Sequence, residues 1–290
     1  KVIVGKENVI DYYLTALLAQ GHILVEDVPG TGKTKLSKAF AISMGMDFSR
    51  IQFTADMLPA DITGLRFYNS KEADFRIRKG PIFSNIVLAD EINRATPKAQ
   101  SALLECMEEG QVTIDGNSFV LEKPFMVVAT QNQIETAGTF VLPEAQLDRF
   151  MLKINMGYPS PDDEMEIINK YYNSDPLDEL EPVCTRQDII RMINEADLVT
   201  ADDEVRRYIV KLVNETRNNS NIAIGASPRA TLALLSAAKA NAYINGKTSC
   251  SIDDVKNIAV PVLAHRIKLK PKNLTGQLNS EEVINSIVWN

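Results

Sequence analysis

The stretch Ile23–Lys38 combines the residue types that bind a polyphosphate. It reads I-L-V-E-D-V-P-G-T-G-K-T-K-L-S-K, an apolar run of strand length, a glycine-containing turn and a helical pattern. A polyphosphate accepts hydrogen bonds from several backbone N–H groups at once, and glycine lets the backbone come that close. We therefore expect a phosphate-binding loop in which Lys33 reaches the β- and γ-phosphates and Thr34 directs its hydroxyl to Mg²⁺.

The same loop is expected to surround the nucleotide with further contacts. It departs from the usual pattern G-x-x-x-x-G-K-[ST] at its first position, where this chain has Asp27. Asp tolerates a left-handed backbone better than most residues, so the turn can be kept. A glycine-rich turn that merely ends a strand is the alternative interpretation. The cofactor-binding residues expected here, besides Lys33 and Thr34, are Pro29, Gly30, Thr31, Gly32 and Lys35.

A second apolar run ends in two carboxylates. Ile86–Glu91 reads I-V-L-A-D-E, which predicts a buried strand that delivers Asp90 and Glu91 to its carboxyl end. In a phosphate-loop protein the first carboxylate holds Mg²⁺ and the second polarises the water that attacks the γ-phosphate. The strand expected at Phe125–Thr130 is followed by Asn132, whose amide can hydrogen-bond that water or the γ-phosphate. Taken alone, Asn132 is better explained as a turn residue.

Strand patterns alternate with helical patterns over the first half of the chain. This alternation is typical of a parallel sheet flanked by helices, which binds ligands at the carboxyl ends of its strands. Leu65–Gly80 and Gln111–Leu121 instead alternate as β-hairpins do, and we expect the first to project and contact another molecule; a solvated hairpin without a partner is the alternative. The other elements expected here are the helices Asn8–Ala19, Lys35–Ser43 and Ala99–Glu108 and the strand Ile51–Thr54.

The clearest linker is Tyr158-Pro159-Ser160-Pro161. It predicts an α/β nucleotide-binding domain over residues 1–158 and an all-helical domain over residues 159–290. Pro261 should kink or end its helix. The helices expected in this domain are Asp162–Tyr172, Thr185–Ala196, Ala201–Asn218, Pro228–Asn245, Ile252–Ile267 and Glu281–Trp289.

The composition narrows the class of protein. The chain has 290 residues, of which 45% are hydrophobic and 24% charged, as in soluble globular proteins of two domains. A net charge of -7 argues against a chain that coats nucleic acid. No apolar run approaches a membrane span, and no N-terminal targeting segment is recognised. Cys106, Cys184 and Cys250 lie too far apart in the sequence for a metal or disulfide framework, so we expect buried thiols and a reducing, cytoplasmic location. His22 and His265 lack the spacing of metal ligands, and we expect structural roles for both.

Together these motifs resemble the AAA+ ATPases, and within them the MoxR family. The resemblance runs from about Val4 to Arg266 and rests on six blocks that occur in the family's order. They are E-D-V-P-G-T-G-K-T (26–34), Q-F-T-A-D-M-L-P-A-D-I-T-G (52–64), L-A-D-E-I-N-R-A (88–95), A-T-Q-N (129–132), L-P-E-A-Q-L-D-R-F (142–150) and G-A-S-P-R-A (225–230).

The resemblance implies a role for each candidate residue. Lys33 and Thr34 match the Walker A residues, Asp90 and Glu91 the Walker B pair, and Asn132 the sensor 1 residue. Two arginines gain roles that local reasoning supports weakly: Arg149 resembles the arginine finger that reaches a neighbouring subunit's γ-phosphate, and Arg229 resembles the sensor 2 residue of a helical lid domain. The family pattern also places Val4 and Gly5 among the cofactor-binding residues.

The resemblance also implies partners. A MoxR-type protein is expected to form a homo-oligomer, most simply a hexameric ring, that couples Mg²⁺–ATP hydrolysis to remodelling, assembly or maturation of a client protein. A partner with a von Willebrand factor A domain often accompanies it. A nucleic-acid motor related to AAA+ helicases is the alternative, although the acidic balance weighs against it. A binding module without turnover is a third class, and intact Glu91, Asn132 and Arg149 argue against it.

Overall fold

The computed structural model describes residues 2–28, 30–132, 139–271 and 278–289. The chain divides into two compact units that interleave along the sequence. The single boundary expected between residues 158 and 159 stays a prediction about folding domains. The first unit comprises residues 1–10, 22–142 and 155–190, and the second comprises residues 11–21, 143–154 and 191–290.

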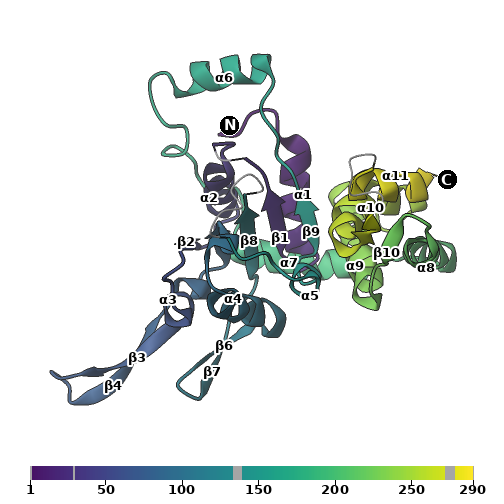
Figure 1. The fold of residues 1–290 in the computed structure, drawn as a ribbon. Coiled ribbons are helices and arrows are strands. Elements are labelled where there is room, and N and C mark those ends of the chain that lie inside the picture. The colour runs from purple at the N-terminus through teal and green to yellow at the C-terminus, as the bar shows by residue number, and fades with distance from the viewer. Residues whose placement is uncertain (1, 29, 133–138, 272–277, 290) are drawn as a thin grey trace. The chain divides into compact units, whose positions relative to one another are not determined.

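A five-stranded sheet in the order β2-β5-β8-β1-β9 confirms the expected α/β fold (Figure 1). Strands β1, β5 and β8 are near-continuous apolar runs and are almost wholly buried, as expected of parallel strands covered on both faces. The pairs β2–β5, β5–β8 and β8–β1 are parallel. The strands are β1 (Ile23–Glu26), β2 (Phe48–Gln52), β5 (Ile86–Asp90), β8 (Met126–Gln131) and β9 (Leu152–Ile154).

The strand expected at Ile51–Thr54 was placed wrongly, because β2 begins at Phe48 and ends at Gln52. Strand β2 lies at one edge of the sheet, and its side chains are only partly buried. Ser49 and Arg50 can therefore be polar within a strand, and polar residues there hide the strand from an apolar pattern. The register pairs Gln52 with Asp90, so β2 and β5 end side by side.

Helices precede and follow the strands of the first unit. Helix α2 follows the phosphate-binding loop directly and packs against β2 and β5. Helix α1 crosses from the first unit to the second at residues 10 and 11, and α7 crosses at residues 190 and 191. These helices are α1 (Glu7–Leu18), α2 (Lys33–Ser43), α3 (Pro59–Thr63), α4 (Pro97–Glu109), α6 (Pro161–Tyr171) and α7 (Arg186–Leu198).

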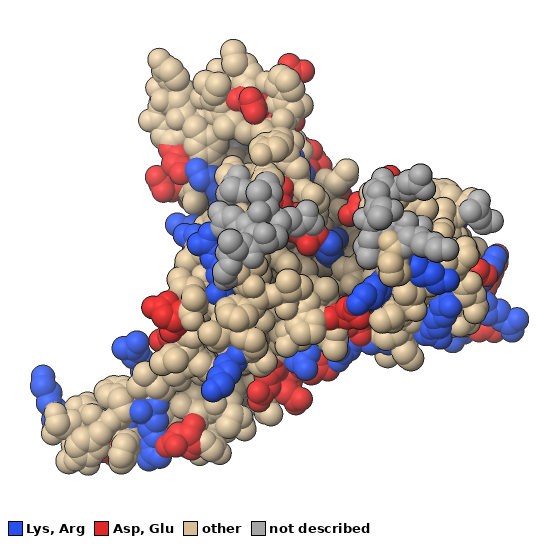
Figure 2. Space-filling view, viewed as in Figure 1, with Lys and Arg blue, Asp and Glu red and all other residues tan. Residues whose placement is uncertain are grey.

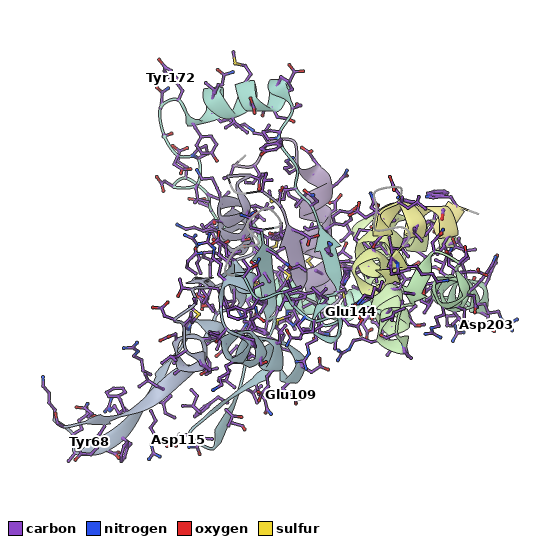
Figure 3. The ribbon with its side chains drawn as sticks, viewed as in Figure 1. Tyr68, Glu109, Asp115, Glu144, Tyr172 and Asp203 are labelled. Carbon is purple, nitrogen blue, oxygen red and sulfur yellow. The ribbon has the colours of Figure 1, made fainter. Side chains whose placement is uncertain are left out.

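Both expected hairpins are present and extend from the same side of the first unit (Figure 1). They are β3 (Gly64–Asn69) with β4 (Asp74–Lys79), and β6 (Gln111–Ile114) with β7 (Asn117–Val120). Figure 3 shows Tyr68 at the outer end of the first hairpin and Asp115 at the outer end of the second. Figure 2 shows Lys and Arg side chains on the surface of the first hairpin.

The second unit is mostly helical. Helix α9 buries a series of alanines, which lets α8 and α10 pack closely against it. One short antiparallel pair, β10 with β11, accompanies the expected helices. The elements are α5 (Glu144–Leu147), α8 (Asp203–Asn218), β10 (Ile222–Ile224), α9 (Pro228–Ile244), α10 (Ile252–Leu263), β11 (Lys268–Leu269) and α11 (Ser280–Trp289).

Helix α10 is shorter than the expected Ile252–Ile267, because it ends at Leu263 and a short 3-10 turn follows. Pro261 lies inside its last turn, where it lacks the N–H that would continue the helix, so the expected ending is confirmed. The start of α10 has a reciprocal cap between Ser251 and Asp254. No helix among the residues that the structure describes is long and apolar enough to cross a membrane.

Both histidines have structural roles, as expected. The His22 Nε2 donates to the Met107 carbonyl (3.1 Å) and its Nδ1 accepts from the Val127 amide (3.0 Å), so the neutral ring joins α4 to β8. Burial lowers the pKa of His22 to about 4. Burial, with the nearby Arg266 guanidinium, lowers the pKa of His265 well below its usual range.

The three thiols are free, but only two of them are buried. Burial raises the pKa of the Cys106 thiol to about 12 and that of Cys250 to about 11. Cys184 is only partly buried, which corrects the expectation that all three are enclosed. Within the described ranges no cluster of His, Cys, Asp or Glu could hold a metal by itself.

Candidate active site

One cavity of the first unit brings the two expected halves of the nucleotide site together. Its volume is about 480 Å³. The loop before α2 and the carboxyl ends of β2, β5 and β8 surround it, which is where a parallel sheet binds ligands. The lining residues are Gly30, Gly32, Lys33, Thr34, Lys35, Arg50, Gln52, Asp90, Glu91, Thr130 and Asn132.

The two glycines of the loop have a backbone conformation that would be strained for other residues. Gly30 and Gly32 have φ of 87° and 86°, in the left-handed region. A Cβ built on either glycine would meet no atom within 4 Å and would project into open space. Gly32 is also the N-cap of α2 and has no side chain that could accept from the first amides of the helix, so these amides suit an anion.

Lys33 lies folded against its own loop. Its Nζ donates to the carbonyls of Asp27 (3.2 Å) and Val28 (3.0 Å). These carbonyls are neutral acceptors, and phosphate oxygens are stronger ones for an ammonium group. The position therefore suits a lysine that can exchange loop carbonyls for phosphate, as the Walker A role requires.

Asp27 keeps the turn in a way that differs from our expectation. It is absent from the left-handed residues of the described chain, so tolerance of that backbone does not explain it. Instead its Oδ1 accepts from the Val28 amide (2.7 Å) and stabilises the turn directly. Asp27 is buried, at 7% exposure, and among the residues that the structure describes its Oδ2 has no hydrogen-bond partner.

The two carboxylates at the end of β5 are held by the neighbouring strand β8. Thr130 Oγ1 donates to Asp90 Oδ1 (2.6 Å) and accepts from the Glu91 amide (2.8 Å). Glu91 has φ 57° and ψ 49°, a left-handed conformation that is costly for a residue with a Cβ. Thr130 therefore fixes both the Asp90 side chain and the Glu91 backbone, and this strain turns Glu91 out of the strand direction.

Strand β2 contributes two polar residues that the sequence analysis missed. Arg50 contacts Asp90 Oδ2 through Nη2 (2.7 Å) and Nε (3.2 Å). Gln52 Nε2 donates to Glu91 Oε2 (3.0 Å), and Gln52 Oε1 accepts from Arg50 Nη2 (2.7 Å). Arg94 also pairs with Glu91 Oε2 (3.1 Å). The sequence does contain a pattern that could have indicated them: Arg50 and Gln52 are two positions apart, so in a strand their side chains lie on the same face.

Asn132 is buried at 8% exposure and lines the same cavity. Its carbonyl accepts from Asn93 Nδ2 (3.3 Å), which ties the end of β8 to the turn after β5. A buried polar side chain needs hydrogen-bond partners, and a ligand in this cavity could be one of them for the amide of Asn132. The sensor 1 role itself stays a prediction.

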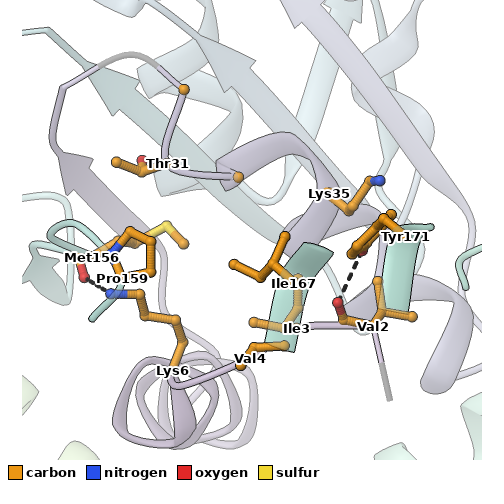
Figure 4. Close-up of a pocket in the computed structure, with 12 residues that line it drawn as sticks. Val2, Ile3, Val4, Lys6, Thr31, Lys35, Met156, Pro159, Ile167 and Tyr171 are labelled. Carbon is orange, nitrogen blue, oxygen red and sulfur yellow. Dashed lines mark hydrogen bonds between the residues drawn. The ribbon is translucent and has the colours of Figure 1, made fainter. Parts of the chain in front are cut away.

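A second, mainly apolar cavity of about 330 Å³ adjoins the loop (Figure 4). It shares Gly30, Gly32 and Lys35 with the polar cavity. Two hydrogen bonds hold its walls: Lys6 Nζ donates to the Met156 carbonyl (2.6 Å) and Tyr171 Oη donates to the Val2 carbonyl (2.9 Å). The remaining lining residues are Ile3, Val4, Thr31, Pro159 and Ile167.

Lys35 connects the loop to the segment after α6. Its Nζ pairs with Asp175 Oδ2 (2.8 Å) and lies 4.0 Å from the centre of the Tyr171 ring. Burial alone lowers the pKa of Lys35, but the hydrogen bond with Asp175 outweighs it, so the pKa is raised above its ordinary value. Lys35 therefore stays charged between the two cavities.

Among the cofactor contacts expected in the first unit, Gly5 is the one described residue that lines neither cavity. Gly5 has φ 64°, and a Cβ there would lie 2.4 Å from Asp163 Oδ1, so its glycine is explained by this close approach to α6. Pro29 lies outside the described residues. Val4, Thr31 and Lys35 do line one or both cavities.

Arg149 and Arg229 belong to the second unit, and their roles at a nucleotide stay predictions. The carboxylate next to Arg149 is engaged elsewhere: Asp148 Oδ1 accepts from the buried Arg266 (2.9 Å) and Asp148 Oδ2 from Ser227 Oγ (2.9 Å). Ser227 is the N-cap of α9, as its sequence indicates, but its hydroxyl makes no cap hydrogen bond. Arg229 follows in the first turn of α9, as expected.

Comparison with known proteins gives an independent view of the chain. Residues 22–152 match the family model described as ATPase family associated with various cellular activities (AAA), and residues 214–287 match the AAA lid domain. The chain is 48% identical to the uncharacterized protein YeaC of Bacillus subtilis, over 99% of this chain and 90% of that protein. It is 41% identical to the chaperone MoxR1 of Mycobacterium tuberculosis, over 99% of this chain and 78% of that protein.

A solved structure has the same fold. The crystal structure of a proposed ATPase from Cytophaga hutchinsonii superposes with a TM-score of 0.93 at 39% identity, covering 99% of this chain and 90% of that one. The similarity therefore extends through the sheet, the hairpins and the helical unit rather than the phosphate-binding loop alone.

Proposed function

The chain belongs to the MoxR family of AAA+ ATPases, and on that premise we propose that it uses Mg²⁺–ATP hydrolysis to remodel, assemble or mature a client protein. It is an ATP-hydrolysing enzyme of the P-loop class. One observation supports the site assignment above the others: Lys33, Asp90 and Glu91 line a single cavity at the carboxyl ends of parallel strands.

The two adjoining cavities suggest how ATP is oriented. The phosphates would lie in the polar cavity, against Gly30, Gly32 and the free amides at the start of α2. The base would lie in the apolar cavity, between Val4 and Tyr171, because a purine ring binds best to apolar walls. Lys33 would leave its loop carbonyls for the β- and γ-phosphates.

The oxygen groups in the polar cavity fit a magnesium ion. Thr34 and Asp90 both line it, and hydroxyl and carboxylate oxygens are the ligands that Mg²⁺ prefers. The ion would supply positive charge that offsets the charge developing on the phosphates. Glu91 would accept a proton from the attacking water, and Asn132 would orient that water or the γ-phosphate.

Hydrolysis is proposed to require a neighbouring subunit. A γ-phosphate in a loose transition state gathers charge on its outer oxygens, where a cation can contribute on the order of 10³ to 10⁵ in rate. In the MoxR pattern Arg149 supplies that cation to the next subunit of a ring, and Arg229 reaches the nucleotide from the lid. Head-to-tail contacts of this kind close into rings, and a hexamer is the form we propose.

The projecting hairpin β3–β4 supports contact with another protein. Phe67, Tyr68 and Phe75 are 40%, 56% and 54% exposed, which is unusual for aromatic side chains in a chain without a partner. Client binding, and a partner with a von Willebrand factor A domain, are proposed on this basis and on the family's chaperone name. A cytoplasmic location is proposed because the thiols are free. The relative named chaperone MoxR1 does not favour the nucleic-acid motor.

Binding and turnover of ATP test the site directly. Lys33→Ala should lose ATP affinity in calorimetry, because it removes the cation that meets the phosphates. Glu91→Gln should keep affinity and lose steady-state hydrolysis, because Glu91 acts on water. Lys38→Ala is the matched control, since Lys38 is an exposed residue of the same helix. A Lys33→Ala protein that binds ATP as tightly as the parent would show that the site is wrong.

Mixing inactive variants tests the ring. Arg149→Ala and Lys33→Ala should each be inactive alone and recover part of the activity when mixed, because some interfaces then join an intact Arg149 to an intact Lys33. Hydrolysis per subunit should also rise with protein concentration. Turnover by a monomer, or no recovery despite proven co-assembly, contradicts the role of Arg149.

A further inference from the structure

Asp90, the carboxylate proposed to hold a metal ion, is paired with the guanidinium of Arg50. Arg50 Nη2 and Nε both contact Asp90 Oδ2, at 2.7 and 3.2 Å, while Thr130 occupies Asp90 Oδ1 at 2.6 Å. Both oxygens of Asp90 are therefore engaged by protein groups. An ion, or a water molecule bound to one, must compete with the Arg50 guanidinium for Oδ2.

The two partners differ in their exposure. The Asp90 side chain is 12% exposed and the Arg50 side chain is 48% exposed. A nearly buried carboxylate needs a compensating charge, because it has lost most of its water. Arg50 can move into solvent or into the cavity at small cost, whereas Asp90 cannot. The cation is thus the exchangeable partner of this pair.

The pair also reaches the second carboxylate. Arg50 Nη2 donates to Gln52 Oε1 (2.7 Å), and Gln52 Nε2 donates to Glu91 Oε2 (3.0 Å). Register explains the arrangement, since Gln52 lies opposite Asp90 across the parallel pair β2–β5. All four residues line the same cavity as Lys33 and Thr34.

We propose that Arg50 is the counter-ion of Asp90 in the metal-free site, and that it must leave Asp90 Oδ2 when a divalent cation and a nucleotide bind together. This inference rests on the proposed nucleotide function. Arg50 then acts as a positioning residue. Without a metal ion, it offsets the negative charge of Asp90, which stabilises the site and lowers the repulsion of incoming phosphates. It also competes with a metal ion for Asp90 Oδ2 until the nucleotide supplies further ligands to that ion.

Two effects follow for a variant without this cation. Removing Arg50 ends its competition for Asp90 Oδ2, so divalent cations should bind more tightly in the presence of nucleotide. It also leaves the negative charges of Asp90 and Glu91 with less compensation, so they repel the phosphates more strongly and nucleotide should bind more weakly without metal. Both effects raise the ratio of the Kd for ADP without metal to the Kd with Mg²⁺.

The experiment measures that ratio by calorimetry, with ADP in EDTA and in excess Mg²⁺. Arg50→Ala should raise it by about tenfold, the size of one charge-assisted hydrogen bond. Arg50→Lys should stay within a few-fold of the parent, because the charge remains. Arg78→Ala is the matched control, an exposed arginine of strand β4 outside the cavity. Binding of Mn²⁺ to the ADP complex, followed by electron paramagnetic resonance, should tighten in Arg50→Ala.

The outcomes separate the inference from the function. A parent protein that binds no ADP overturns the proposed nucleotide site and the inference with it. A parent that binds ADP while Arg50→Ala leaves the ratio unchanged, or lowers it, overturns the inference alone. If Arg50→Ala does not fold, Arg50→Gln keeps the first two methylenes of the stem and a polar end group without the charge, and it must raise the ratio in the same way.

Discussion

Acid should destabilise the first unit through His22. The buried neutral ring accepts a hydrogen bond from the Val127 amide at Nδ1, so a proton on Nδ1 would face another N–H. The ordinary pKa of histidine is 6.5, and burial lowers that of His22 to about 4. Between these values the unfolded chain binds the proton and the folded chain does not.

The magnitude follows from this difference. A gap of about 2.5 between 6.5 and about 4, at 1.36 kcal/mol for each pKa unit, corresponds to about 3 kcal/mol. This contribution to the free energy of unfolding is fully present above pH 6.5. It is lost as the pH falls towards 4, and His22→Gln should remove the loss because glutamine does not titrate. Its amide can still donate to Met107 and accept from Val127.

Native-state hydrogen exchange of the β8 amides is the assay, because it reports on the strand that His22 contacts. The only tryptophan, Trp289, lies in the second unit, so fluorescence would report on the wrong part of the chain. Carboxylates also titrate over this range, and comparing the two proteins at each pH cancels them. If the parent and His22→Gln lose the same free energy between pH 7 and 4, His22 is not the acid-sensitive group.

Other contacts yield predictions of comparable size. Thr130→Val removes the hydroxyl that holds Asp90 and takes away the partner of the partly buried Glu91 amide, so the unfolding free energy should fall by about 1–3 kcal/mol and ATP hydrolysis should fall more than ADP binding. Urea unfolding and steady-state assays check this against Thr113→Val, an exposed threonine on β6; equal losses in the two variants would contradict it. Arg266→Met removes the buried cation of the pair and leaves the partly buried Asp148 without its partner, so it should destabilise the second unit by about 3–5 kcal/mol, measured by Trp289 fluorescence in urea. Arg206→Met, at an exposed pair on α8, should cost less than about 1 kcal/mol, and a similar cost in both would refute the importance of burial.

The residues that touch a phosphate could be identified from the sequence because their chemistry is local. The run G-T-G-K-T places two glycines, a lysine and a hydroxyl on one turn and the helix that follows it, whatever the rest of the chain does. The strand Ile86–Asp90 likewise carries its own carboxylates to its end. The parallel fold follows from apolar runs that alternate with helical patterns, since such strands are stable only when both faces are covered.

What holds those residues was decided by tertiary structure. Arg50 and Asp90 are 40 positions apart, and only the register of β2 against β5 brings them into contact. Thr130 reaches Asp90 and Glu91 in the same way from β8. Polar residues on an edge strand make no apolar pattern, so the sequence indicated only the end of β2, at Ile51 and Gln52, and not its role.

The second unit shows the same division. The cap of α10 by Ser251 and Asp254 could be predicted, because its partners lie within one turn. The pairing of Asp148 with Arg266, 118 positions away, could not, and the adjacent Arg149 was the more obvious partner in sequence. A local pattern determines which groups a segment presents, whereas long-range packing determines which of them meet, because burial selects the pairs that can satisfy each other's charges and hydrogen bonds.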